Sequence, residues 1–119
     1  MKCRFVFMWG AALWLSSPSA HAVQMTISDL HEICSATDEV SKAACRFYIL
    51  GVTEGAGMGA GIAHDQRHFC TPEGVTSEKM VSIVKEAMKI DLAAFPQDKD
   101  MPAVSFVTAA MMRAYPCQK

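Results

Sequence analysis

The sequence predicts an all-α fold, a small disulfide-stapled bundle of about four helices. Three observations predict it: apolar residues recur at spacings of three and four, strand-like alternation is nearly absent, and four cysteines remain after residue 22. We expect a cleaved signal peptide over residues 1–22 and one helical domain over residues 23–119. A domain of this size has a thin core, so covalent cross-links would supply much of its stability.

The first 22 residues have the parts of a secretory signal peptide. Lys2 and Arg4 precede an apolar run over residues 5–15, and Ala20-His21-Ala22 forms a small-residue cleavage site. This run is shorter than the roughly 20 residues that span a bilayer, and no later stretch is both long and uncharged. Cys3 precedes the run, so a lipoprotein cleavage site is not supported. We therefore expect an exported chain without a membrane anchor, in an oxidising compartment.

Two helices are predicted in the first half of the mature chain. The first runs from Thr26 to Cys34, with Thr26 or Ser28 as its N-cap. Polar residues 35–38 separate it from a second helix, whose apolar positions are expected to face the core. These positions are Val40, Ala44, Phe47, Tyr48, Leu50 and Val52.

Glycines are concentrated in the C-terminal part of this second helix. Gly51, Gly55 and Gly59 are four residues apart, and Gly57 and Gly61 lie between and after them. A glycine inside a helix costs up to about 1 kcal/mol relative to alanine, so the helix is predicted to fray or end after Gly55. The spacing matches a membrane dimer motif, but the surrounding residues are too polar for lipid. Close helix packing within a soluble bundle is therefore the preferred interpretation.

Two more helices are predicted in the second half. A loop from Ala63 to Val75 precedes the third helix, which Thr76 or Ser77 caps and which ends before Pro96. A short charged turn leads to the fourth helix, which ends before Pro116. The buried positions predicted for the fourth helix are Val104, Phe106, Val107, Ala110, Met111 and Ala114.

Four cysteines allow three pairings, and the predicted helix pairs favour one of them. Cys34 and Cys45 flank the turn between the first two helices, so they can meet across that hairpin. If the third and fourth helices are antiparallel, Cys70 before the start of one lies beside Cys117 after the end of the other. We therefore predict the disulfides Cys34–Cys45 and Cys70–Cys117.

The mature chain shows little sign of catalysis, metal binding or nucleic-acid binding. Removal of Lys2 and Arg4 with the leader moves the formal net charge from −1 to −3, and no basic stripe is present to follow phosphates. His64 and His68 stand four apart near Cys70, but this cysteine is expected in a disulfide. The carboxylates are scattered, without the spacing of an acid–base pair. We expect no enzyme activity, no metal and no cofactor.

Several short blocks occur in a characteristic order: Leu30-x-x-x-Cys34, Cys45-Arg46-Phe47-Tyr48-Ile49-Leu50-Gly51-Val52, Phe69-Cys70-Thr71-Pro72 and Tyr115-Pro116-Cys117. With these blocks the sequence resembles the Rap/Tai immunity family over nearly the whole mature chain. Proteins of that family protect bacteria against peptidoglycan amidases delivered by type VI secretion. The resemblance implies a periplasmic, all-helical, disulfide-bonded protein, often a homodimer, that plugs the active-site cleft of its amidase.

A partner-binding site is predicted at the turn between the third and fourth helices. Gln97, Asp98, Lys99 and Asp100 form a polar turn clamped by two helix ends, and its carboxylates can pair with catalytic or rim groups of an amidase. A rigid turn fills a narrow cleft with little loss of conformational entropy. The alternative is that Asp98 and Asp100 only cap a helix.

Two further surfaces are candidates. The loop from His64 to Phe69, with His64 and His68, is the second surface predicted to contact a partner protein. Apolar residues of the third helix that a thin bundle leaves uncovered are expected at the contact of a homodimer.

Two other functions stay open on the sequence alone. One is a small periplasmic acid-stress chaperone of the HdeA kind, which shields clients with exposed apolar surface; seven methionines after the leader and twelve carboxylates suit that idea. It would lose structure and bind a hydrophobic dye near pH 3, as an inhibitor need not do. The other is an orphan adaptor protein of the cell envelope.

Overall fold

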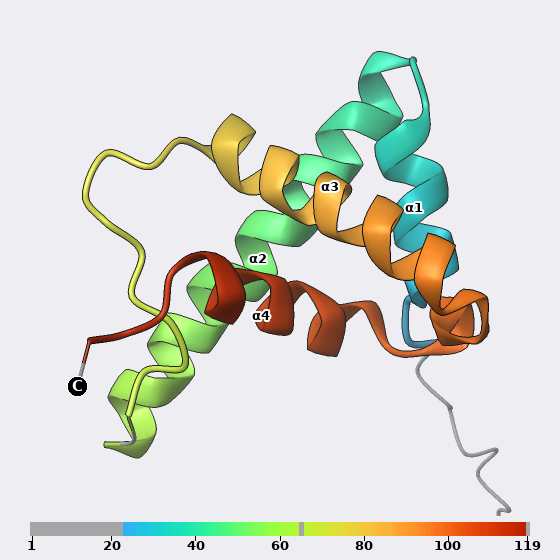
Figure 1. The fold of residues 1–119 in the computed structure, drawn as a ribbon. Coiled ribbons are helices and arrows are strands. Elements are labelled where there is room, and N and C mark those ends of the chain that lie inside the picture. Colours follow the sequence, from blue (N-terminus) through green and yellow to red (C-terminus); the bar gives the residue numbers. More distant parts are fainter. Residues whose placement is uncertain (1–22, 65, 119) are drawn as a thin grey trace, which may run out of the picture.

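The computed structural model describes residues 23–64 and 66–118, which form four α-helices and one short 3-10 helix (Figure 1). This confirms the predicted all-α bundle, while the predicted signal peptide lies outside the described residues. No helix among the described residues is long and apolar enough to cross a membrane. The elements are α1 (Ile27–Ser35), α2 (Glu39–Ala63), α3 (Ser77–Ala94), η1 (Pro96–Asp100) and α4 (Ala103–Ala114).

Side-chain caps fix the start of three helices. Thr26 caps α1 through a capping box, in which its hydroxyl accepts from the Asp29 amide while the Asp29 carboxylate accepts from the Thr26 amide. Asp38 accepts from the Ser41 amide at the start of α2, and Thr76 accepts from the Lys79 amide at the start of α3. The sequence left two candidate caps open for α1 and two for α3. The cap is Thr26 in α1 and Thr76 in α3.

The bundle consists of two helical hairpins, and α2 is its central element. Helices α1 and α2 form the first hairpin, and α3 and α4, joined by η1, form the second; α2 contacts α1, α3 and α4 (Figure 1). The Cys34–Cys45 disulfide closes the first hairpin, and the Cys70–Cys117 disulfide joins the loop before α3 to the chain after α4. The predicted pairing is confirmed.

The core lies where the two hairpins meet. It draws on every α-helix, and α2 contributes Cys45, Ile49 and Thr53 from a single face. The largest of the fully buried side chains are Ile27, Leu30, Ile49, Met88, Met111, Val84 and Val107. Partly buried residues such as Tyr48 and Val52 pack at its edge.

The second helix passes through all five of its glycines without a break. It ends at Ala63, eight residues after Gly55 and where the predicted loop begins, and His64 closes it in the left-handed conformation with its amide bonded to the Ala60 carbonyl. Ala60 is buried in these last turns, although it lies outside the main core cluster. Glycine lowers helix stability without preventing helix formation.

The expected close packing around the glycines is wrong. A Cβ atom added at any of the five glycines of α2 would meet nothing within 4 Å, apart from the helix's own backbone and the adjacent residues. The predicted core face of α2 is wrong as well at Val40, Ala44 and Phe47, which are exposed. The helix turns Cys45 and Ile49 inward instead, because the first disulfide pulls Cys45 against α1.

Helix α4 follows its prediction at four of six positions. Phe106, Val107, Ala110 and Met111 are buried, together with Ala103. Val104 and Ala114 are exposed. Val104 falls outside the arc that these five residues occupy, whereas Ala114 lies within that arc but is the last residue of the helix, beyond the buried positions.

Candidate functional site

The polar turn predicted as a partner-binding site is the 3-10 helix η1, which leads directly from α3 into α4. Its backbone is tightly bonded: the Asp98 amide donates to the Phe95 carbonyl at 3.0 Å, and the Met101 amide donates to the Asp98 carbonyl at 2.9 Å. Pro96 fixes the first backbone angle of the turn. Each of these features restricts the conformations that the turn adopts.

The segment before α1 supports the base of this turn. Thr26 and Pro102 form an isolated antiparallel bridge. The Ile27 amide donates to the Met101 carbonyl, and the Ala103 amide donates to the Met25 carbonyl, each at 2.9 Å. These two hydrogen bonds tie the chain between η1 and α4 to the segment before α1. Figure 1 shows the blue and orange segments side by side there.

The side chains of the turn are directed to the outside. Gln97, Lys99 and Asp100 are exposed and Asp98 is half-buried. Within the described part of the chain, neither carboxylate caps a helix: Pro102 is the N-cap residue of α4, without a side-chain hydrogen bond. The predicted cap at Asp100 is therefore wrong. No ion pair among the described residues engages Asp98, Lys99 or Asp100, so these charged groups are free to meet a partner.

The second predicted surface lies at the other end of the second hairpin. His64 and His68 are exposed in the loop between α2 and α3, whereas η1 follows the far end of α3 (Figure 1). The predicted partner-binding residues therefore form two separate surfaces. Among the described residues, no group of three or more His, Cys, Asp or Glu side chains is placed to hold a metal ion.

The loop that carries this second surface is anchored where it returns to the bundle. Phe69 is buried in the core, and Cys70 is bonded to Cys117. The Cys70 amide also donates to the Tyr115 carbonyl at 2.8 Å. The exposed histidines thus stand on a segment fixed at one end by α2 and at the other by these contacts.

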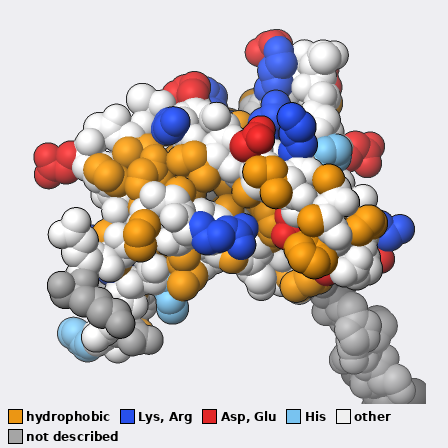
Figure 2. Space-filling model, viewed as in Figure 1, with side chains coloured by type: hydrophobic (Ala, Val, Ile, Leu, Met, Phe, Trp, Pro, Cys, Tyr) orange, Lys and Arg blue, Asp and Glu red, His pale blue; other side chains and the backbone are white. Residues whose placement is uncertain are grey.

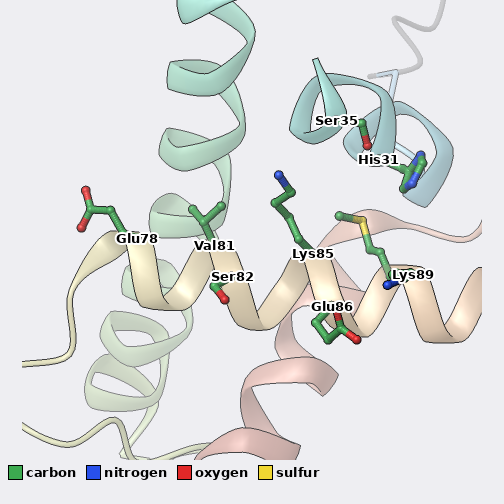
Figure 3. Close-up of a pocket in the computed structure, with 9 residues that line it drawn as sticks. His31, Ser35, Glu78, Val81, Ser82, Lys85, Glu86 and Lys89 are labelled. Carbon is green, nitrogen blue, oxygen red and sulfur yellow. The ribbon is translucent and has the colours of Figure 1, made fainter. Parts of the chain in front are cut away.

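An open groove of about 600 Å³ between α1 and α3 was not predicted from the sequence. His31 and Ser35 line it on the side of α1, and Lys85, Glu86 and Lys89 line it on the side of α3, with the Lys85 side chain extending toward α1 (Figure 3). The four-residue spacing of His31 and Ser35 is visible in the sequence, as is that of Lys85 and Lys89. The groove was not predicted because helix contacts were predicted only within each hairpin, and α1 and α3 belong to different hairpins.

The groove is lined by charged, polar and apolar side chains, among them His31, Glu78, Val81 and Lys85. Apolar side chains gather on the face formed by α3 and α4, with Lys and Arg side chains between and around them (Figure 2).

Comparison with known proteins gives one clear relation. No curated protein and no solved structure matches the chain. The sequence model of the Rap1a immunity proteins matches residues 26–117, which extend from the N-cap of α1 to the last cysteine. This match covers all five helical elements and both disulfides. The chain therefore belongs to the Rap1a family of immunity proteins.

Proposed function

We propose that the mature chain is a periplasmic immunity protein that binds a peptidoglycan amidase of a type VI secretion system and blocks its active-site cleft. The observation that carries the proposal is the η1 turn, a charged projection whose base is bonded to the segment before α1. The chain belongs to a family of immunity proteins, which act by binding and are not enzymes. Two disulfides suit an oxidising compartment such as the periplasm.

The restricted conformation of the η1 turn suits it to block the active-site cleft of the amidase. A segment that is already ordered loses little conformational entropy when it enters a cleft. Asp98 and Asp100 then offer carboxylates to the catalytic or rim groups of the amidase, and Gln97 and Lys99 offer hydrogen-bond donors. The loop with His64 and His68 is proposed as a second contact, on another part of the amidase or on a second amidase molecule.

We also propose that the chain acts as a homodimer, as the family resemblance implies. The third helix, where the dimer contact was expected, exposes Ile90 on its surface. A dimer presents two copies of the η1 turn, so it binds two amidase molecules.

The decisive experiment measures inhibition of the cognate amidase by the purified mature chain. If the neighbouring gene encodes a small secreted NlpC/P60-like cysteine amidase, that amidase is the enzyme to use. The double variant Asp98→Asn and Asp100→Asn is expected to weaken inhibition by about tenfold or more, because loss of one side of a desolvated charge pair is costly. The matched control, Glu32→Gln with Glu73→Gln, removes two exposed carboxylates elsewhere and should inhibit like the unmodified chain.

The same assay gives results that contradict the proposal. If the unmodified chain leaves the amidase fully active, the immunity role toward that enzyme is wrong. If the double variant inhibits as strongly as the unmodified chain, the carboxylates of η1 do not contact the enzyme.

A further inference from the structure

The two disulfides of this chain differ in their exposure to solvent. Cys34 is 4% exposed and Cys45 2%, so the bond between them lies inside the core. Cys70 is exposed and Cys117 is half-buried, although Phe69 next to Cys70 is buried. A disulfide is reduced only when a thiolate reaches one of its sulfurs. In the folded chain a reductant can therefore reach the second disulfide and not the first.

An open hollow of about 830 Å³ lies at the exposed disulfide. Both Cys70 and Cys117 line it, together with the loop after α2, Met112 of α4 and the chain after α4. The residues that the loop contributes include Arg67 and His68. A cation beside a disulfide attracts the attacking thiolate and stabilises the thiolate that leaves. The hollow thus gives a reductant both room and a favourable charge.

The surroundings of the two sulfurs indicate which one is attacked. The Sγ atom of Cys117 lies 3.6 Å from the Arg67 carbonyl oxygen, whereas Cys70 is the more exposed residue. A disulfide sulfur has no proton to donate, but the Cys117 thiol that forms on reduction has one and lies beside that carbonyl. Attack at Cys70, with Cys117 as the leaving group, is therefore favoured.

Contacts that use no sulfur atom keep the two cysteines together once the bond is broken. The Cys70 amide donates to the Tyr115 carbonyl at 2.8 Å, and Tyr115 packs against the core. Phe69, next to Cys70, is itself part of that core. The two thiols therefore stay close, and the bond re-forms when an oxidised dithiol is present. Exchange at this site is reversible for that reason.

We propose that the Cys70–Cys117 disulfide is a site of reversible thiol–disulfide exchange with a dithiol oxidoreductase, while the buried disulfide is a permanent cross-link. A thiolate of the oxidoreductase attacks the Cys70 sulfur, which forms a mixed disulfide and releases Cys117 as a thiol. The second thiol of the oxidoreductase then attacks the oxidoreductase sulfur of this mixed disulfide and releases Cys70. Two electrons and two protons pass to the two cysteines, and the oxidoreductase becomes a disulfide.

The exchange regulates one of the two proposed partner surfaces, a consequence that rests on the proposed function. In the oxidised chain the loop with His64 and His68 is fixed by α2 at one end and by the disulfide at the other. Reduction removes the covalent attachment and loosens the loop. The η1 turn follows the far end of α3 and is held by its own backbone hydrogen bonds. Reduction should therefore weaken the second contact and leave the first intact.

The test measures which bond is reduced in the folded mature chain. Dithiothreitol or reduced thioredoxin is added without denaturant, free thiols are alkylated at intervals, and peptide mass spectrometry identifies the alkylated cysteines. Cys70 and Cys117 should react faster than the other two cysteines by about tenfold or more. In urea that unfolds the chain the rates should converge, because burial no longer protects the inner bond. Equal rates in the folded chain, or resistance of the exposed bond to thioredoxin, would overturn the proposal.

Two further measurements test the details of the attack. The monothiol mercaptoethanol, quenched with acid at short times, should leave its adduct on Cys70, and an adduct mainly on Cys117 would show that the order of attack is wrong. Arg67→Gln should slow reduction by about threefold at low salt. Lys99→Gln removes a cation from η1 instead and should not change the rate. Equal rates in the two variants would show that Arg67 does not assist the attack.

Amidase inhibition separates the exchange from the immunity role. A chain reduced and alkylated only at Cys70 and Cys117 should keep its helical circular dichroism and bind the cognate amidase about threefold to tenfold more weakly. Undiminished binding would show that the bond does not regulate the contact. If neither form of the chain inhibits, the proposed function is wrong, and the alkylation rates still decide whether the bond exchanges.

Discussion

The backbone amide of Cys70 donates a hydrogen bond to the Tyr115 carbonyl at 2.8 Å, two residues before the cysteine to which Cys70 is disulfide-bonded. This pair of contacts joins the end of the exposed loop to the end of the chain. Tyr115 also packs against the core, and its own amide donates to the Met111 carbonyl in the last turn of α4. The disulfide therefore closes a contact that backbone and side-chain packing already favour.

Loss of this disulfide should destabilise the protein more than loss of the other one. The Cys70–Cys117 bond spans 47 residues and the Cys34–Cys45 bond spans 11. Chain-entropy estimates give about 4 kcal/mol for the longer loop and about 3 kcal/mol for the shorter one. Urea unfolding of the two double serine variants, Cys70→Ser with Cys117→Ser and Cys34→Ser with Cys45→Ser, measures the difference. A larger loss in the Cys34 and Cys45 variant would show that buried packing of these two side chains outweighs the loop entropy.

The helices and disulfides could be predicted from the sequence because their signals are local. Thr26 and Thr76 precede helical patterns, and each cysteine pair stands at the two sides of a predicted hairpin. The orientation of α2 could not be predicted, since Phe47 and Ile49 both belong to apolar patterns of helical period. Which of two apolar faces enters the core depends on packing against other helices, and a single helix does not encode that choice.

The candidate site was likewise predictable only in part. The turn at residues 97–100 was predictable from Pro96 and its charged residues. Its support was not, because the hydrogen bonds to Met25 and Ile27 use backbone atoms, which leave no mark in the residue types. The groove between α1 and α3 was missed for a related reason, as it arises from contact between two hairpins that are separate in the sequence.

Replacement of His64 by glycine should stabilise the protein. His64 ends α2 with a φ angle of 52°, the only positive φ among the described residues other than glycine. Glycine adopts this conformation without the steric penalty of a Cβ atom, so His64→Gly is expected to raise the free energy of unfolding by about 0.5–1 kcal/mol. Thermal unfolding measures this change. His68→Gly, in the same loop without a positive φ, is the control and should not raise stability.

Shortening the mature N-terminus past Met25 should loosen the η1 turn. A chain beginning at Thr26 lacks the Met25 carbonyl that accepts from the Ala103 amide. Hydrogen exchange at Ala103 should therefore accelerate, and inhibition of the cognate amidase should weaken, because a less ordered turn loses more entropy on binding. A chain beginning at Met25 is the control. Unchanged exchange at Ala103 in the shorter chain would show that the remaining Ile27 to Met101 hydrogen bond holds the turn alone.

Acid should weaken the helix starts without exposing the core. Hydrogen bonds from the Thr26 backbone and side chain lower the pKa of Asp29, and those from Ser41 lower the pKa of Asp38. The folded-state pKa of each lies below its unfolded value of about 3.8. The stabilisation is therefore present above about pH 4 and is lost as pH falls through the folded-state values.

Urea unfolding from pH 7 to pH 2.5 measures this loss. The variant with Asp29→Asn and Asp38→Asn should lose less stability over that range than the unmodified chain, because two of the groups that gain a proton are absent. Glu32→Gln, which removes a carboxylate but no cap, should keep the full acid dependence of the unmodified chain. Both disulfides persist in acid, so the folded chain should bind no more hydrophobic dye at pH 3 than its exposed apolar side chains bind at pH 7. A sharp rise in dye binding at pH 3, with loss of helical circular dichroism, would instead favour an acid-stress chaperone over an inhibitor.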